Sequence, residues 1–192
     1  MKAVPTKFVI TYACVAAVGC LADLATKHVV FAWLGAPVNH PVGPEFHVWK
    51  NIYFQTSLNE GGLFGIGQGM SIPFAILAIG AVAAIVYWLF FRGGARDYLL
   101  TNSLGLITAG ILGNLYDRLG LPGLVWGYPN RWHRVGDPVY AVRDWILVYI
   151  GNWPWPTFNI ADSMLVCGTA LLFWHTWRYA PADEVDQPQA RD

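Results

Sequence analysis

The chain has 192 residues, of which 55% are hydrophobic and only 12% are charged. Soluble domains carry about 25% charged residues, so this composition indicates a membrane protein with a single domain. The formal net charge is zero, which gives no reason to expect nucleic acid as a partner. The three Cys lack the spacing of a zinc site or of a disulfide framework, so neither is expected.

The first apolar segment runs from Phe8 to Trp33 and is long enough to cross a bilayer, which takes about 20 residues. A removable signal peptide is the alternative, because Ala17 to Cys20 resembles a lipoprotein cleavage box, but the apolar segment continues past it. Asp23 and Lys27 are four residues apart and share one helix face. They form either a neutralising salt bridge near the outer end of this helix or a pair that positions a site.

Residues 35–65 have a different character. After several prolines, residues 46–58 are rich in aromatic and β-branched side chains, which predicts one or two short strands. Because isolated strands cannot cross lipid, we expect a small sheet on the membrane face. Residues 59–65 follow with several glycines, and they form either a plain turn or a loop that a ligand can approach closely.

Two more apolar segments, Ile72 to Phe91 and Tyr98 to Leu115, are predicted to be membrane helices. The second contains many small residues, which favour close helix packing. Asn114 and Asp117 lie at its end and are three residues apart, so they share a helix face.

A long loop, residues 119–143, leads to Asp144 and a short apolar segment, and a fourth helix is predicted from Phe158 to Trp177. The predicted organisation is one membrane-embedded domain, 1–179, and a polar cytoplasmic tail, 180–192. Its helices are expected at about 8–33, 72–91, 98–115 and 158–177, and its external segments at about 35–65 and 118–157.

Four membrane helices place both termini on one side, which we assign to the cytoplasm. Several polar residues then fall together at the outer side, although they come from separate segments. Ionisable groups next to lipid are costly, so they indicate a functional site. These residues are Asp23, Asn59, Asn114, Asp117, Asp144, Asn159 and Asp162.

Asp144 and Asp162 are the candidates for catalysis. Asn159 lies one helical turn before Asp162 and can orient it. Two carboxylates that meet in a poorly solvated site hold a single proton between them. One can then activate water while the other protonates the substrate. The rival hypothesis is a proton relay in a small transporter, but these carboxylates cluster at one interface and do not line a path across the bilayer.

The ordered motifs resemble those of signal peptidase II, the bacterial lipoprotein signal peptidases, which are intramembrane aspartic proteases. The resemblance covers about residues 8–178. The motifs that carry it are D-x-x-T-K at Asp23 to Lys27, N-x-G-x-x-F-G at Asn59 to Gly65, G-N-x-x-D-R at Gly113 to Arg118, V-x-D before an apolar stretch at Asp144, and F-N-x-A-D at Phe158 to Asp162.

The resemblance implies an endopeptidase without cofactor or metal that cuts diacylglyceryl-modified prolipoproteins just before the lipidated Cys. It implies four transmembrane helices with a small extracytoplasmic β-sheet cradle, in the bacterial inner membrane. Contact with membrane lipids, a monomeric state and inhibition by globomycin are expected as well. The resemblance also implies a role for each matching position. The catalytic residues would be Asp144 and Asp162, and the residues that bind substrate or orient the pair would be Asn59, Asn114, Arg118 and Asn159. The residues that support the site would be Asp23, Lys27, Asp117 and Gly61.

The loop 119–143 is longer than the connection usual in this family. Its length leaves a second alignment open, in which Asp137 takes the place of Asp144. We prefer Asp144 because an apolar segment follows it, whereas Pro138 follows Asp137. The insertion is either an enlarged lid or lipid-binding surface, or plain loop growth. A non-catalytic lipoprotein-binding paralogue remains an alternative function.

Overall fold

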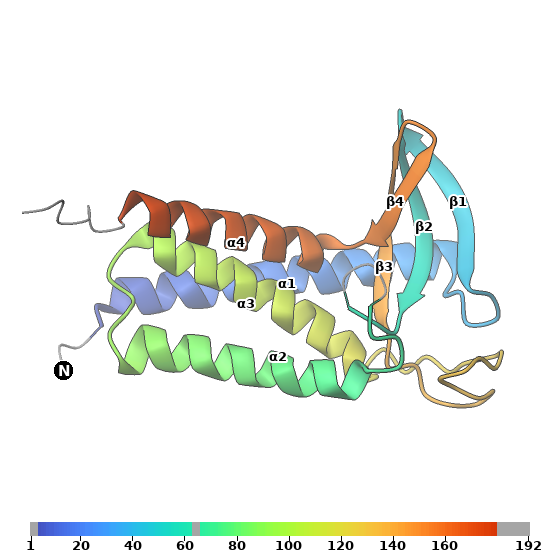
Figure 1. The fold of residues 1–192 in the computed structure, drawn as a ribbon, viewed down its shortest axis with the longest axis horizontal. Helices are drawn as coiled ribbons and strands as arrows, with labels where there is room; N and C mark the ends of the chain where they lie inside the picture. Colours follow the sequence, from blue (N-terminus) through green and yellow to red (C-terminus); the bar gives the residue numbers. More distant parts are fainter. Residues whose placement is uncertain (1–3, 63–65, 180–192) are drawn as a thin grey trace, which may run out of the picture.

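A computed structural model describes residues 4–62 and 66–179 of the chain. Helices lie side by side along one axis, and a small sheet stands at one end of them (Figure 1). The elements in chain order are α1 (Thr6–Leu34), β1 (Val42–Trp49), β2 (Ile52–Asn59), α2 (Ser71–Val86) with its π-helical extension η2 (Tyr87–Phe91), α3 (Tyr98–Arg118), β3 (Val142–Ile150), β4 (Trp153–Phe158) and α4 (Ile160–Arg178).

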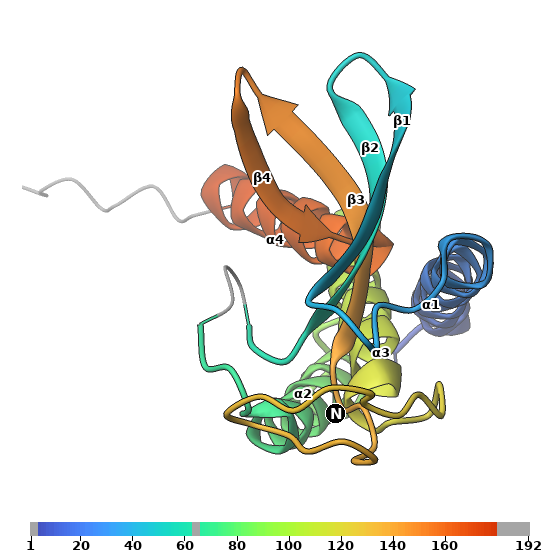
Figure 2. The same ribbon diagram turned by 90° about the vertical axis from the view of Figure 1, so that its right-hand side faces the viewer.

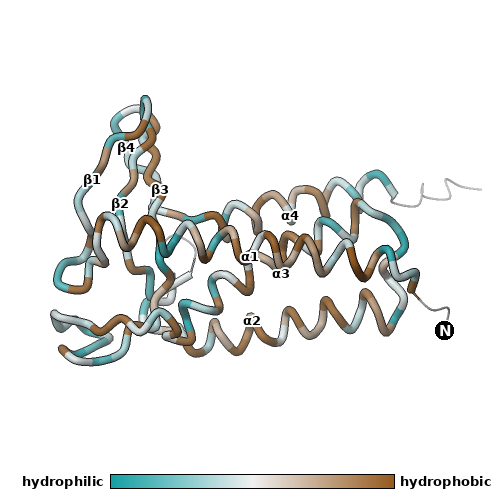
Figure 3. Tube along the Cα trace, turned by 180° about the vertical axis from the view of Figure 1, so that it is seen from behind, coloured by the Kyte–Doolittle hydropathy of each residue, from teal (hydrophilic) through white to brown (hydrophobic). Residues whose placement is uncertain are grey.

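Three of the described helices are long and apolar enough to cross a membrane: α1, α2 with η2, and α3. Many large apolar side chains on them are exposed, as expected for surfaces that face lipid. Figure 3 shows apolar residues along the helices and polar residues mainly toward the ends of the bundle. The 19-residue helix α4 is not among these three; it carries Asp162 in its first turn and His175 and Arg178 in its last.

Helix α3 is the centre of the bundle and packs against α1, α2 and α4. Glycines allow the close approach of its neighbours. A Cβ atom at Gly110 would collide with the backbone of Ala161 in α4, and one at Gly113 would collide with the Asp23 carboxylate in α1. The small residues of α3 therefore bring the polar ends of α1 and α4 together, in agreement with the packing role predicted for them.

The predicted sheet is present and has four antiparallel strands in the order β1-β2-β3-β4. Residues 46–58 lie almost entirely in β1 and β2, as the sequence indicated. Strands β3 and β4 were not anticipated, because the sequence indicated only a short apolar segment after Asp144 within the external residues 118–157. Two prolines lie in β4, an edge strand, where a missing N–H is tolerated.

The sheet crosses the end of the bundle and contacts the end of α1 (Figure 2). Val30 and Phe31 of α1 form an apolar cluster with Trp145 of β3. In the register of the sheet, Ser57 is opposite Asp144 and Asn59 is opposite Val142. This packing fixes the first residues of β3 beside the ends of α1, α3 and α4.

Residues 119–141 form the long loop between α3 and β3. It has a small core of its own, made by Trp126, Val139 and Ala141, and a single bridge pairs Val125 with Pro138. Its backbone also reaches the segment after α1, where Gly127 N donates to Val38 O at 2.8 Å. The long loop thus has an ordered structure of its own and is hydrogen-bonded to the segment after α1.

Candidate active site

Asp162 is held at the start of α4 by a reciprocal capping box with Asn159. The Asp162 backbone N–H donates to Asn159 Oδ1 at 2.9 Å, and the Asn159 backbone N–H donates to Asp162 Oδ2 at 3.2 Å. This arrangement satisfies two N–H groups that a helix start otherwise leaves unpaired. It also fixes the carboxylate at the positive end of the helix dipole.

Asp144 is the third residue of β3 and is 2% exposed. Its Oδ1 accepts a hydrogen bond of 2.6 Å from Asn159 Nδ2. Burial raises the pKa of the Asp144 carboxyl well above its usual range, and the negative charge of Asp162 raises it further. Lys27 and hydrogen bonds from Asn159 and Asn59 act in the opposite direction. The two carboxylates therefore interact, and burial together with Asp162 shifts the Asp144 carboxyl toward its protonated form.

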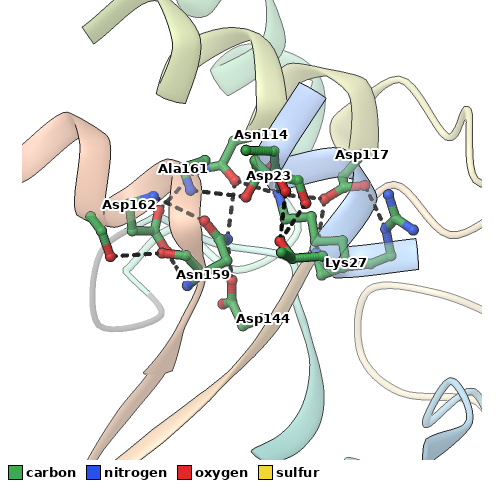
Figure 4. Close-up of polar contacts among 12 residues, drawn as sticks. Asp23, Lys27, Asn114, Asp117, Asp144, Asn159, Ala161 and Asp162 are labelled. Atoms are coloured by element: carbon green, nitrogen blue, oxygen red, sulfur yellow. Dashed lines mark hydrogen bonds and ion pairs between the residues drawn. The ribbon is translucent and has the colours of Figure 1, made fainter. Parts of the chain in front are cut away.

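Two asparagines connect the carboxylates, as Figure 4 shows. Asn114 Nδ2 donates to Asp162 Oδ1 at 2.9 Å, and Asn159 Nδ2 donates to Asn114 Oδ1 at 3.1 Å as well as to Asp144. Lys27 Nζ completes the chain by donating to Asn114 Oδ1 at 3.0 Å. One continuous hydrogen-bond network thus runs from Asp144 through Asn159 to Asp162, Asn114 and Lys27.

A buried cluster of charges lies behind this network. Lys27 Nζ is 2.7 Å from Asp23 Oδ2 and 2.9 Å from Asp117 Oδ2, and Arg143 Nε is 2.7 Å from Asp117 Oδ1. The side chains of Asp23, Lys27 and Asp117 are fully buried. Two cations and two anions balance, which buried charges require. Asp23 Oδ1 also accepts from the Ala161 N–H at 2.8 Å, which ties α1 to the turn that carries Asp162.

The glycine-containing turn after β2 forms another wall of the site. Asn59 Oδ1 accepts from the Gly61 N–H at 3.0 Å, and Arg118 Nη2 donates to Gly61 O at 2.9 Å. Asn59 therefore holds the turn while its side chain also lies beside Asp144. Among the described residues, Arg118 Nη1 is buried without a hydrogen-bond partner. It is a donor that remains available for a bound molecule.

The structure brings all ten residues singled out from the sequence into this region. Asp137, the alternative to Asp144, is not part of it. Its Oδ2 accepts from the Arg134 N–H at 2.7 Å inside the long loop, so the contacts favour the alignment that places Asp144 in the pair. Sequence reasoning missed Arg143. A signal was present, because an arginine directly before Asp144, in a segment that becomes strongly apolar, requires a buried partner.

Fold and site together define a membrane protein that holds two interacting carboxylates where its helix bundle meets its sheet. The chain matches the family model of signal peptidase II over residues 15–178. It therefore belongs to the signal peptidase II family.

Individual relatives agree with this assignment. The chain is 43% identical over 155 residues to a lipoprotein signal peptidase of Rhodopirellula baltica, a match that covers 78% of this chain and 64% of that protein. It is 33% identical over 137 residues to a lipoprotein signal peptidase of Aquifex aeolicus, with 70% and 71% covered. A solved bacterial membrane enzyme that is 23% identical has the same fold, with a TM-score of 0.72 and 95% and 96% of the two chains covered.

Proposed function

We propose that this protein is an aspartic endopeptidase that removes signal peptides from diacylglyceryl-modified prolipoproteins by cutting before the lipidated Cys. The observation that carries the proposal is the pair Asp144 and Asp162, joined through Asn159, with the pKa of Asp144 raised by burial and by Asp162. Family membership supplies the substrate class, since the relatives described above are lipoprotein signal peptidases.

We assign different roles to the two carboxyl groups. Asp144, whose pKa is raised, carries the shared proton and donates it to the oxygen of the scissile carbonyl. Asp162, at the helix N-terminus, accepts a proton from the attacking water. The water oxygen bonds to the carbonyl carbon and gives a tetrahedral intermediate. When the C–N bond then breaks, the Cys nitrogen takes a proton from Asp162 and leaves as an amine, while one hydroxyl of the intermediate returns a proton to Asp144 and becomes the carbonyl oxygen of the new carboxyl group.

The network around the pair keeps this geometry ready. Asn114 and Asn159 hold the carboxylates in place, while Lys27 holds Asn114. Arg118 Nη1 and the turn at Gly61 are the groups we assign to binding of the substrate backbone. Preorganised donors of this kind contribute to catalysis because they need no reorientation during the reaction.

We further propose that α4 is a fourth membrane span. It lies alongside the other helices, so it would cross the same layer of the membrane as they do (Figure 1). Both termini then lie in the cytoplasm, the sheet and the active site lie near the outer face of the bacterial inner membrane, and the protein acts as a monomer in contact with lipid. Cysteine labelling of the turn at residues 92–97 and of the long loop in intact cells tests this orientation: only the loop should react with an impermeant reagent.

The decisive test is cleavage of a diacylglyceryl-modified prolipoprotein by the purified chain in detergent, with and without EDTA. Wild type should cut before the lipidated Cys in both conditions. Asp144→Asn and Asp162→Asn should be inactive, while Asp137→Asn, a carboxylate outside the site, should retain activity. Wild-type protein that binds substrate without cutting it would instead indicate a lipoprotein-binding paralogue.

A further inference from the structure

A groove separate from the carboxylate pair lies between α1 and the outer end of α3. Its volume is about 710 Å³, within the range of about 300–1,000 Å³ usual for sites of small molecules. One wall is the side of α1 that includes Leu21, Leu24 and Ala25, and the other is formed by Tyr116 and the start of the long loop at Leu121. Helix α4, which carries Asp162, lies on the other side of α3 in the end-on view (Figure 2).

Arg143 links this groove to the wall of the active site. Successive side chains of a strand point to opposite faces, so Asp144 faces Asn159 whereas Arg143 points away from it and lines the groove. The residue is 6% exposed. Its guanidinium carbon lies 5.8 Å from the centre of the Phe31 ring and 6.0 Å from that of Tyr116.

The guanidinium has hydrogen-bonding capacity left over. Nε bonds Asp117, but the terminal nitrogens of Arg143 donate no hydrogen bond to any residue that the structure describes. Among the described lining residues, Arg143 and His28 are the only basic ones and none is acidic. A nearly buried guanidinium that faces an otherwise apolar groove therefore favours an anionic oxygen.

The shape of the groove indicates that the bound molecule also has a long apolar part. From Leu21 to Phe31, α1 rises by roughly 15 Å, and its wall over this length is apolar except for His28. The cation lies at the Phe31 end, where α1 approaches the sheet, and the apolar wall extends from there into the membrane-spanning part of the helix. The groove is therefore complementary to a molecule with a phosphate at one end and a hydrocarbon chain at the other.

We propose that this groove is a binding site for one glycerophospholipid, with its phosphate on Arg143 and an acyl chain along Leu21 and Leu24. The diacylglyceryl group of a prolipoprotein carries no phosphate, so the site selects a membrane lipid over the lipid part of the substrate. An apolar peptide helix would leave the terminal nitrogens of Arg143 without an acceptor, because only Nε is paired with Asp117. The inference does not depend on the proposed peptidase activity.

The experiment is a lipid titration of the full chain in detergent, followed by native mass spectrometry. The probes are dioleoylphosphatidylglycerol, dioleoylglycerol, which lacks the phosphate, and inorganic phosphate alone. Ala25→Trp fills the groove from an exposed position of α1, and Ala22→Trp places the same side chain on α1 outside the groove. Both side chains are exposed on α1, and thermal melting of both variants checks that they fold.

Wild type and Ala22→Trp should retain one phospholipid with the same affinity, and Ala25→Trp should bind it at least about ten-fold more weakly. Dioleoylglycerol should bind wild type at least about ten-fold more weakly than the phospholipid, and inorganic phosphate alone should neither bind nor displace it. Binding of the lipid should raise Tm in wild type and Ala22→Trp only, because a ligand of the folded state stabilises it.

Three results would overturn the proposal. Equal binding by Ala25→Trp and Ala22→Trp would place the lipid elsewhere. Equal affinity for dioleoylglycerol would show that the groove is an apolar surface that does not recognise the phosphate. Such a surface would also bind the lipid part of the substrate. A dimer in wild type that Ala25→Trp abolishes would show that a second copy of the chain fills the groove.

Discussion

At the scale of single residues, Asn159 connects several parts of the site. It caps α4, orients Asp162 through the capping box and donates to both Asp144 and Asn114. An amide suits this position because it offers a donor and an acceptor without adding a charge to a site that already holds two carboxyl groups. A carboxylate in its place would repel both.

Removal of this amide should affect the site more than the fold. Asn159→Ala loses a cap worth about 1 kcal/mol and leaves polar atoms unpaired at about 1–3 kcal/mol. We expect a lower Tm and a loss of at least about 100-fold in cleavage rate, as for other preorganised donors. Ser163→Ala, which loses only a hydrogen bond to Asn159 O, should stay within about three-fold of wild type. Similar losses in both variants would mean that Asn159 acts only as a helix cap.

Asp144 makes stability depend on pH. Since its pKa is raised in the folded protein, the folded state binds a proton that the unfolded state has released. The contribution of this group to stability is therefore complete below the usual Asp pKa of about 4 and is lost as pH rises through the higher folded value. At neutral pH the buried carboxyl thus destabilises the fold, while in the proposed mechanism it is the proton donor.

Asp144→Asn should abolish cleavage and yet raise Tm at pH 7 by about 3 °C or more. The difference from wild type should shrink as pH falls below about 4, where the wild-type carboxyl becomes protonated in the unfolded state as well. Thermal melting in detergent across this pH range measures it, with Asp137→Asn as a carboxylate control that should follow wild type. A variant that is less stable than wild type at every pH would contradict the assignment of the proton to Asp144.

At the scale of elements, the glycines of α3 decide where the ends of the helices meet. Gly110 lies against the backbone of Ala161, so even one methyl group must push α4 away from α3. Asp162 is the next residue in α4, and a shift of this kind would separate it from Asn114. Close packing of helices and assembly of the site are therefore one property of this chain.

Two glycine substitutions test this link. Gly110→Ala should destabilise the protein by about 1–3 kcal/mol, the usual effect of overpacking, and should lower cleavage by more than its effect on folding explains. Gly80→Ala is the matched control, because a Cβ atom there meets nothing within 4 Å, and the gain in helix propensity should stabilise by about 0.5–1 kcal/mol. Tm and the cleavage rate of folded protein distinguish the two effects; equal behaviour of both variants would contradict the argument.

The sequence was most informative where chemistry is local. Apolar length located the helices, β-branched and aromatic residues located β1 and β2, and spacing placed Asp162 beside Asn159. The partner of Asp162 was less certain, because only the pairing of β3 with β2 opposite Ser57 brings Asp144, and not Asp137, to the site. Strand β4 escaped prediction because its prolines suggest a turn, and only the edge of a formed sheet tolerates them. Arg143 was missed because its partner, Asp117, lies 26 residues earlier in the sequence.

At the scale of the whole molecule, the long loop is connected to the turn that borders the site. Glu60 makes the connection, since its Oε1 accepts from Asn130 Nδ2 at 3.0 Å and lies 3.6 Å from His133 Nε2. The His133 ring in turn stacks on Trp126, with ring centres 3.8 Å apart. The folded core of the insertion thus reaches a residue that lies directly between Asn59 and Gly61 of the candidate site.

Glu60→Ala should therefore lower activity from outside the carboxylate pair. Loss of a partly exposed hydrogen bond costs about 1 kcal/mol, which corresponds to roughly a five-fold lower kcat/KM. The defect should lie mainly in KM, because the turn at Gly61 and Arg118 holds substrate in our proposal whereas the pair itself is untouched. Faster proteolysis within residues 119–141 should accompany it, since the loop loses its anchor.

Glu45→Ala is the matched control. Glu45 also accepts hydrogen bonds, from Tyr149 and Gln55, but it does so in the sheet and away from the turn. It should leave both kcat/KM and the proteolysis of the loop unchanged. If Glu60→Ala instead lowers kcat at constant KM, the insertion acts on the geometry of Asp144 through Asn59, and if neither quantity changes, the loop rests on the site without contributing to it.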